Sequence, residues 1–255
     1  MICIVSPAKS LNFDNYNPSD SNTMPDFLKE SQRLVNQLKK KSPKSIAKLM
    51  SISDNLAELN YQRFQDWEMA HESGEIKQAM YAFKGDVYLG LEAETFSEDT
   101  LAYANNHFRM LSGLYGVLKP MDIIHPYRLE MGTKINIGTH KNLYSFWGPK
   151  IAKKLNELGK EQNDSTLLNL ASNEYFKSVD KKTLKLDIWT PVFKDHKNGN
   201  YKVISFFAKR ARGMMTKFVL ENRIEQLDDL RAFNSDGYYF EGIDEKKQEI
   251  IFLRD

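Results

Sequence analysis

The stretch LKLDIWTPVFKDHKNGNYKVISFFA, residues 184–208, decides the fold class of this chain. Two runs rich in β-branched and aromatic residues, 184–193 and 201–208, flank a short polar segment that contains Asn198-Gly199. An Asn-Gly pair between two such runs is the strongest short-range signal for a β-hairpin. The sequence therefore predicts an antiparallel pair of strands in this part of the chain.

Three further segments extend the predicted sheet. GYYFEG (237–242) and QEIIFLR (248–254) predict a second hairpin near the C-terminus. MICIV (1–5) and TLLNLA (166–171) are short, apolar runs bounded by polar or turn-forming residues, as buried strands are.

Helical periodicity dominates the first half of the chain up to about residue 112. Ser42-Pro43, Asp54 and Ser97 are suitable starts, because Ser and Asp cap helices and Pro is tolerated in the first turn. The last of these helices is predicted to hold Phe108 and Leu111 on its buried face. Helices grouped early and strand pairs grouped late predict an α+β fold, as a single domain over residues 1–255. Its sheet is expected to be mixed, largely antiparallel and flanked by helices.

The composition is that of a globular protein with no membrane-spanning segment. The 255 residues are 41% apolar, and no apolar run approaches the roughly 18 residues that a membrane span requires. The N-terminus has no signal-peptide pattern, and a single cysteine, Cys3, suits a reducing compartment. We therefore expect a cytoplasmic protein. Cys3 is either an oxidation sensor or, as its position in a buried strand favours, an inert core thiol.

The net charge of +2 conceals an uneven distribution along the chain. Residues 1–127 carry a net charge of −3, residues 128–223 carry +10, and residues 224–255 carry −5. A basic middle between acidic flanks indicates an anionic partner bound at one place. The alternative is that solvated lysines on exposed faces account for the excess.

The basic segment ends in ISFFAKRARGMMTKFVLENR, residues 204–223, which predicts the end of a strand followed by a helix. Lys209, Arg210 and Arg212 are then expected in the first helical turn, where the helix dipole favours anions and opposes cations. Such an arrangement weakens the empty protein and strengthens the binding of a phosphate. The cluster is therefore a candidate anion site, unless these cations pair with carboxylates elsewhere in the fold.

Two strand ends supply further candidate ligands. SPAKSL, after the first strand, contributes Lys9 and Ser10, and NLASNEYFK, after the strand at 166–171, contributes Ser172, Glu174 and Lys177. Ligands of α/β sheets often bind where strands end. Neither segment is a P-loop, because both lack the glycines that allow backbone amides to wrap a phosphate.

Two other segments carry cations in a loop-like or turn-like context. LSGLYGVLKPMDIIHPYRLEMG (111–132) is irregular and contains Lys119 and Arg128, the latter with Glu130 as a candidate partner. Within 143–159, Gly148-Pro149-Lys150 followed by an apolar helical pattern is similar to the second helix of a helix-hairpin-helix DNA-binding motif. A plain amphipathic helix with solvated lysines is the other interpretation of this segment.

Several kinds of site lack their sequence patterns. The histidines are never three or four residues apart, and one cysteine makes no thiolate cluster, so we predict no metal site. No nucleophile elbow, dinucleotide-binding glycine pattern or kinase pattern is present, so no catalytic residue and no cofactor is assigned.

SPAKSL, LSGLYGVLKPMDIIHPYRLEMG, LYSFWG, NLASNEYFK and ISFFAKRARGMM occur together and in this order. The chain thereby resembles the YaaA family of bacterial peroxide stress proteins, over essentially all of its length. The resemblance implies a cytosolic protein that limits damage by hydrogen peroxide and is linked to low unincorporated iron. It also implies a fold of its own type, and DNA binding, including distorted forms, through a basic cleft and a helix-hairpin-helix element. No enzymatic reaction is implied. The cations carried over are Lys9, Lys84, Lys119, Arg128, Lys150, Lys177, Lys209, Arg210 and Arg212.

Three functional hypotheses follow, and they differ in the shape of site they require. The preferred one is a non-enzymatic DNA-binding protein that contacts phosphates along an open basic groove. The second is an enzyme or binding protein for a small phosphorylated or nucleotide-like ligand, which requires a closed pocket. The third is direct iron binding, for which the sequence contains only one cluster of acidic residues. The second would use Lys9, Ser10, Ser172, Glu174 and residues 209–212, and the third Glu92, Glu94, Glu98 and Asp99.

Overall fold

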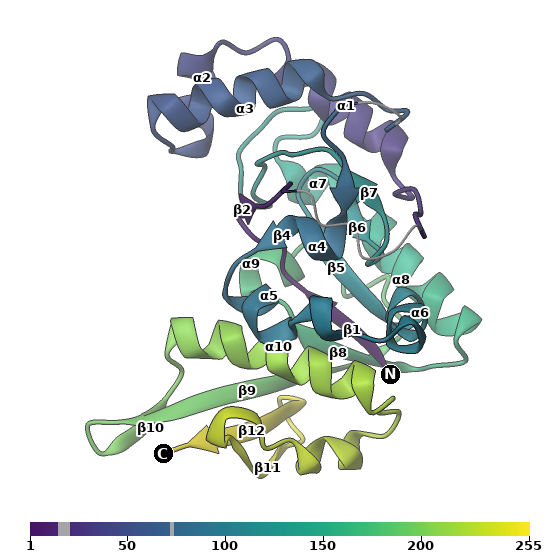
Figure 1. The fold of residues 1–255 in the computed structure, drawn as a ribbon, viewed down its shortest axis with the longest axis vertical. Coiled ribbons are helices and arrows are strands. Elements are labelled where there is room, and N and C mark those ends of the chain that lie inside the picture. Colours follow the sequence, from purple (N-terminus) through teal and green to yellow (C-terminus); the bar gives the residue numbers. More distant parts are fainter. Residues whose placement is uncertain (15–20, 72–73) are drawn as a thin grey trace.

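The computed structural model describes residues 1–14, 21–71 and 74–255, and its main sheet runs through the middle of the molecule (Figure 1). The strands are β1 (Ile2–Val5), β5 (Phe108–Ser112), β6 (Gly116–Leu118), β8 (Thr166–Leu170), β9 (Asp187–Lys197), β10 (Asn200–Lys202), β11 (Tyr239–Asp244) and β12 (Glu249–Arg254). Their order is β11-β12-β9-β8-β1-β5-β6, with β10 paired to β9. The pairs of β1 with β5 and β8, of β8 with β9 and of β9 with β12 are parallel. The predicted mixed sheet is therefore confirmed, but its centre is parallel and its antiparallel pairs lie toward the edges.

Both predicted hairpins are present. Strand β9 pairs antiparallel with β10 around Asn198-Gly199, and β11 pairs antiparallel with β12. The first hairpin is shorter than predicted, because β10 ends at Lys202 and a helix begins at Ser205. Residues 205–208 were predicted to continue the strand. Burial of the helical face that Ala208, Ala211 and later residues form outweighs the β-propensity of the Ile-Ser-Phe-Phe run.

The described chain also forms helices, short strands and 3-10 turns, joined by irregular segments. The helices are α1 (Leu28–Leu38), α2 (Pro43–Met50), α3 (Asp54–Asp66), α4 (Ala79–Ala82), α5 (Asp86–Leu91), α6 (Glu98–His107), α7 (Leu143–Trp147), α8 (Lys150–Glu161), α9 (Asn173–Phe176) and α10 (Ser205–Glu221). The 3-10 turns are η1 (Ala93–Thr95), η2 (Leu227–Ala232) and η3 (Ser235–Gly237), and the short strands are β2 (Ser10–Leu11), β3 (Lys77–Gln78), β4 (Phe83–Lys84) and β7 (Ile123–Ile124). Helices α2 and α3 lie at the opposite end of the molecule from the β9–β12 region (Figure 1).

Two of the predicted helix starts are confirmed and one is displaced by a residue. Ser42 and Ser97 cap α2 and α6 through their side chains. Helix α3 is capped by Ser53, whose hydroxyl accepts the N–H of Leu56, rather than by Asp54. The prediction of one helix from 97 to 112 is wrong in its second part, because α6 ends at His107 and the next residues form β5. All of β5 is buried, so its apolar run has no alternation to distinguish it from a helix face.

The core is centred on β1, whose four residues are inaccessible to solvent. Cys3 belongs to this strand, and burial raises the pKa of its thiol to about 12. A thiol that stays protonated is a poor nucleophile and is slow to oxidise. The position of Cys3 confirms the predicted buried thiol in the first strand.

Helices α5 and α10 cross in direct backbone contact. A Cβ atom added to Gly213 of α10 would lie 1.8 Å from the carbonyl oxygen of Val87 in α5. A Cβ added to Gly90 would lie 2.2 Å from the carbonyl oxygen of Arg210. Glycine at both positions is therefore what permits the two helices to touch, and this contact fixes α10 beside the segment that precedes α5.

A buried aromatic cluster links the N-terminal helices to the loop after β5. The indole nitrogen of Trp67 donates to the hydroxyl of Tyr115 (2.8 Å), and His71 Nε2 lies 3.2 Å from the same hydroxyl. The rings of His71 and His125 pack with their centroids 4.4 Å apart. Burial lowers the pKa of His71 to about 4 and also lowers that of His125.

The low pKa of His71 predicts that the protein loses stability when the solution is acidified. The unfolded chain binds the proton with a pKa near 6.5, so the folded state is disfavoured as the pH falls from there to about 4. The contribution of His71 should reach about 3 kcal/mol of unfolding free energy at the acidic end. Denaturant unfolding at several pH values should therefore show the stability gap between wild type and His71→Asn narrowing with acidification. A gap that does not change with pH for His71→Asn would contradict the assignment.

Candidate phosphate-binding site

The site begins at the carboxyl ends of β1 and β8, which lie side by side in the sheet and run parallel. After β1 the chain leads to β5 on one side of the pair, and after β8 it leads to β9 on the other side. Where successive connections diverge in this way, a crevice forms outside the strand ends, and ligands of α/β sheets bind there. The segments that follow the two strands, SPAKS and ASNEY, are the ones that the sequence singled out.

A pocket of about 460 Å³ occupies this crevice. The first two walls come from the segments after β1 and β8, the third from β4 and the start of α5, and the fourth from α10. The structure therefore brings together half of the predicted phosphate ligands, as well as the residues predicted for a small ligand except Arg210 and Ala211. Its lining includes the predicted residues Lys9, Ser10, Lys84, Ser172, Glu174, Lys209 and Arg212.

The base of the pocket is held by serine and tyrosine hydroxyls. Ser6 Oγ accepts the backbone N–H of Ser172 (2.9 Å) and lies 3.1 Å from its hydroxyl. Tyr88 donates to the carbonyl oxygen of Ser6. Glu174 turns to the rim, where its carboxylate accepts the backbone N–H of Gly132. These bonds tie the ends of β1 and β8 to each other, so the pocket is preformed in the absence of a ligand.

Arg212 is the cation on which the electrostatics of the pocket depend. Its side chain is half-buried, and burial lowers the pKa of its guanidinium. Within the described residues this guanidinium has no ion-pair or hydrogen-bond partner. A desolvated cation without a counter-ion is unfavourable in the empty protein. An anion that entered the pocket would satisfy it, and a bidentate phosphate suits the geometry of a guanidinium.

Two lysines add exposed positive charge around Arg212. Lys84 lies on β4, where it pairs with Ser10 of β2. Lys209 lies one helical turn before Arg212 on α10. Neither lysine forms an ion pair within the described residues. Lys9 is largely exposed and pairs with Glu130 at 2.7 Å, so its charge is partly compensated.

The expected position of the cations at the start of the helix was wrong. Helix α10 begins at Ser205, so Lys209 is its fifth residue and Arg212 its eighth. The field of the helix dipole falls off within the first turn. The cations are therefore aimed at the pocket from the side of the helix, and they do not oppose its positive end. Arg210 is exposed and does not line the pocket.

Two predicted cations are neutralised by carboxylates. Arg128 pairs with Glu130 (2.9 Å), the same carboxylate that holds Lys9, so this trio lies beside the pocket. The Nε of Arg128 is buried and has no hydrogen-bond partner among the residues that the structure describes. Lys119 lies 3.5 Å from the buried carboxylate of Asp122, which also accepts the backbone N–H of Lys119. Lys119 thus stabilises its own loop and is not brought to the pocket.

Lys150 and Lys177 lie around the short helix α7. Lys177 is placed over the ring of Tyr144, and Lys150 over the ring of Phe146. Lys150 also donates to the carbonyl oxygen of Phe146 (2.8 Å), where a cation satisfies the C-terminal end of α7. Helices α7 and α8 are joined by Gly148-Pro149, and α7 has only five residues. The helix-hairpin-helix interpretation stays a prediction.

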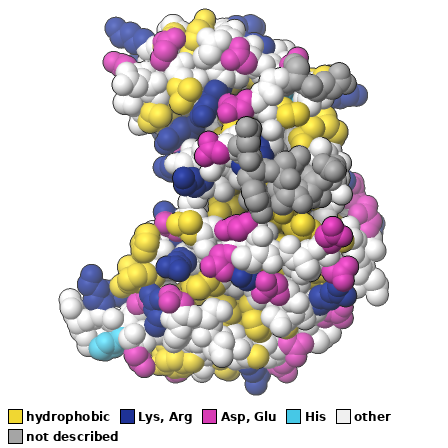
Figure 2. Space-filling view, in the orientation of Figure 1, with side chains coloured by type: hydrophobic (Ala, Val, Ile, Leu, Met, Phe, Trp, Pro, Cys, Tyr) yellow, Lys and Arg dark blue, Asp and Glu magenta, His cyan; other side chains and the backbone are white. Residues whose placement is uncertain are grey.

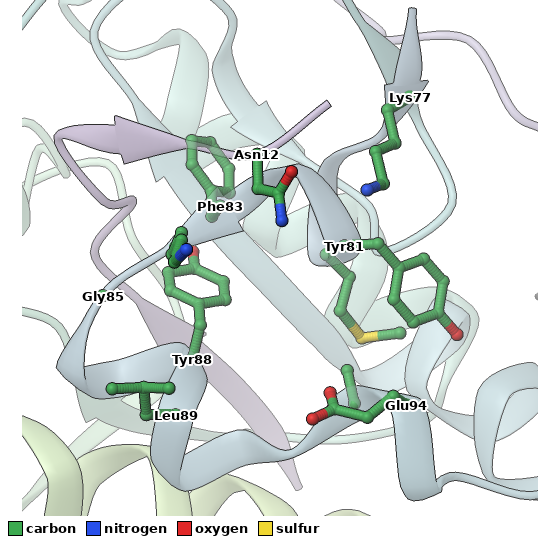
Figure 3. A pocket seen from close by; sticks show the side chains of 11 residues that line it. Asn12, Lys77, Tyr81, Phe83, Gly85, Tyr88, Leu89 and Glu94 are labelled. Carbon is green, nitrogen blue, oxygen red and sulfur yellow. The ribbon is translucent and has the colours of Figure 1, made fainter. Parts of the chain in front are cut away.

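A second pocket, which the sequence did not indicate, adjoins the first (Figure 3). It measures about 320 Å³ and shares Lys84, Gly85 and Tyr88 with the phosphate pocket. Lys77 is buried at one side of it and donates to the carbonyl oxygen of Asp14, and burial lowers the pKa of its amine. No sequence pattern marks Lys77, because it lies on a strand of only two residues.

On a larger scale the molecule is hollowed along one side (Figure 2). The hollow lies between the end that carries α2 and α3 and the protruding β9–β10 hairpin (Figures 1 and 2). Lys and Arg side chains are frequent along its wall, with acidic and apolar side chains among them (Figure 2). Positive charge is thus partly gathered on this concave face (Figure 2).

No three His, Cys, Asp or Glu side chains of the described chain lie close enough together to hold a metal ion. Glu92, one of the acidic residues considered for iron, forms an ion pair with Lys217 at 2.7 Å. In the part of the chain that the structure describes, no helix combines the length and hydropathy needed to cross a membrane.

Comparison with known proteins agrees with the sequence resemblance. Residues 1–243 match the family described as peroxide stress protein YaaA. Two relatives from Aliivibrio fischeri, strains MJ11 and ATCC 700601 / ES114, are both described as UPF0246 proteins. Each is 50% identical over 255 residues, which span 100% of this chain and 98% of the relative. The similarity therefore includes every segment that forms the pocket.

Proposed function

Because the chain belongs to the YaaA family of peroxide stress proteins, we propose that it binds DNA through its phosphates in the cytoplasm during peroxide stress. The observation that carries the proposal is Arg212, a half-buried guanidinium in a pocket at the strand ends that has no counter-ion among the described residues. Lys84 and Lys209 add charge at the same place that no described carboxylate pairs. A phosphate bound there would relieve the desolvated arginine.

The surroundings of the pocket favour a polyanion over a single small anion. Arg210 extends the positive charge along α10 beyond the pocket, and the hollowed face offers room for a chain that continues past it (Figure 2). Contacts of this kind hold the backbone and do not read the bases, which suits a protein that protects DNA of any sequence. The link to low unincorporated iron is an expectation from the family resemblance, and the pocket has no part in it.

The second candidate is a small phosphorylated or nucleotide-like ligand in the same pocket. It is favoured by the enclosure of the pocket and by the hydroxyls of Ser6, Ser10 and Ser172, with Glu174 at the rim. Pockets that bind small molecules are typically of this size. The two candidates share the arginine and differ in how much of the surface outside the pocket is used.

Titration of fluorescent duplex, single-stranded and bubble DNA at several salt concentrations tests the proposal. We expect binding whose logarithmic affinity falls linearly with the logarithm of salt between about 50 and 200 mM, because phosphate contacts release counter-ions. Adenosine monophosphate and inorganic phosphate serve as competitors for the small-ligand candidate. Absent or salt-insensitive binding of all three DNA forms, together with saturable binding of adenosine monophosphate, would favour the second candidate.

A further inference from the structure

An aromatic surface lies at the base of the protruding hairpin and the start of α10. Four rings there are exposed: Tyr201 of β10 at 39%, Phe206 and Phe207 of α10 at 55% and 38%, and Tyr239 of β11 at 39%. Val203, 53% exposed, lies in the same stretch of chain. Exposed apolar rings indicate a binding surface when they lie next to one another. Tyr201 and Tyr239 lie on the other face of the sheet edge, because they pair with His196 and Leu253, which alternate with Asp195 and Arg254 on the α10 side. Phe206 and Phe207 lie together at the start of α10, and we refer to these two rings as the aromatic platform.

The platform is held in place by contacts that leave ring surface open to solvent. Phe206 and Phe207 pack edge to face with their centroids 5.7 Å apart, and the guanidinium of Arg254 covers Phe207 at 4.4 Å. The rings are thus positioned before any partner binds.

The platform is continuous with the phosphate pocket along one helix. Lys209 and Arg210 follow Phe206 by three and four residues, a spacing that makes side chains neighbours on a helix surface. Arg212 lies about 9 Å further along the helix than Phe206, at a rise of about 1.5 Å per residue. Lys202, which is exposed on β10, precedes these residues in the chain. Exposed rings and cations thus lie next to each other at the start of α10.

We propose that the aromatic platform stacks the unpaired bases of a nucleic-acid strand whose backbone phosphate is held by Arg212 and Lys209. The inference rests on the proposed function, since it extends the same site outward. Rings interleaved with cations suit a single strand, because every base has a face that stacks and every linkage a charge. The bases of an intact duplex are stacked on one another, so their faces are not available to the platform.

Phe206→Ala tests the proposal without disturbing the core, because more than half of this side chain is already in solvent. The probes are a fluorescent single-stranded oligothymidylate, an abasic oligonucleotide of the same length, and a duplex. We expect Phe206→Ala to weaken binding of oligothymidylate about 5- to 150-fold, the usual range for losing one stacked base. Binding of the duplex and of the abasic strand should change less than about twofold. Leu59→Ala, at a similarly exposed apolar position on α3, should change none of the three.

A Phe206→Trp variant adds a direct readout and a rescue. It should bind oligothymidylate at least as well as wild type, and its indole fluorescence should be quenched by oligothymidylate but not by the abasic strand. If wild type binds oligothymidylate and the abasic strand equally well, or if Phe206→Ala binds oligothymidylate like wild type, the platform does not stack bases. If wild type binds no DNA at all, the proposed function itself has failed. A change in sedimentation of Phe206→Ala without loss of oligothymidylate binding would assign the platform to contact with a second copy, and would also overturn the inference.

Discussion

Replacing Lys84, Lys209 and Arg212 together by alanine should weaken DNA binding about a thousandfold and flatten its dependence on salt. Each lost hydrogen bond to a charged group removes at least about 1.5 kcal/mol, and the three together account for that factor. The slope of log affinity against log salt should decrease by about 2.7 for a duplex and about 2.1 for a single strand. Fluorescence anisotropy titrations at several salt concentrations measure both quantities.

The matched control removes the same charge from another part of the surface. Lys160, Lys182 and Lys185 are exposed, and none of them lines the phosphate pocket. Their triple alanine variant has the same net charge as the first, so a general electrostatic effect would weaken both equally. If the two variants had equal slopes of log affinity against log salt, the pocket would not be part of the DNA interface. The overall charge of the protein would then account for binding.

Replacing Arg212 alone should change DNA binding and protein stability in opposite directions. Because its guanidinium is desolvated and has no partner in the described part of the chain, Arg212→Met should bind DNA more weakly and yet unfold at a higher temperature than wild type. Arg212→Lys keeps the charge but loses the planar fork, so it should recover only part of the affinity. The opposite signs of the two effects are expected of a residue placed for a ligand rather than for the fold.

Much of this pocket was predictable from the sequence because it lies where strands end. SPAKSL and NLASNEYFK each follow a short apolar run, and parallel neighbours in a sheet bring such segments together. The sequence did not distinguish Arg212 from Arg210, since two residues along a helix turn a side chain by about half a revolution. Which of the two faces the pocket depends on how α10 packs against α5, and this is a tertiary property.

The fold shows the same division between local and tertiary information. The hairpin at Asn198-Gly199 was predictable, because the turn chemistry is local to the two residues. Strand β5 was not predictable, because its residues are buried on both faces and do not alternate between buried and exposed. The start of α10 was placed too late, because Phe206 and Phe207 are β-formers that remain exposed at the head of a helix. The residues whose β-propensity leads to a wrong prediction here are those of the aromatic platform.

Gly213→Ala should destabilise the protein by about 3 kcal/mol or more and lower its melting temperature by roughly 10 °C. Alanine is the better helix former, so local propensity alone predicts a gain of up to about 1 kcal/mol. The new Cβ, however, would lie 1.8 Å from the carbonyl oxygen of Val87 and 2.8 Å from the amide nitrogen of Leu91. Backbone atoms cannot rotate away as a side chain can, so α5 and α10 have to move apart.

The same substitution should damage the pocket, because its two cationic walls are carried by the two helices. Lys84 precedes α5, and Arg212 belongs to α10, so separation of the helices moves them apart. Thermal unfolding and DNA titration at low temperature should therefore both report a loss. Gly242→Ala is the control, since a Cβ there would have no atom within 4 Å, and it should melt within about 2 °C of wild type. A Gly213→Ala protein that melts like this control would mean that the crossing is looser than the backbone contact requires, and that Arg212 is not held in the pocket by it.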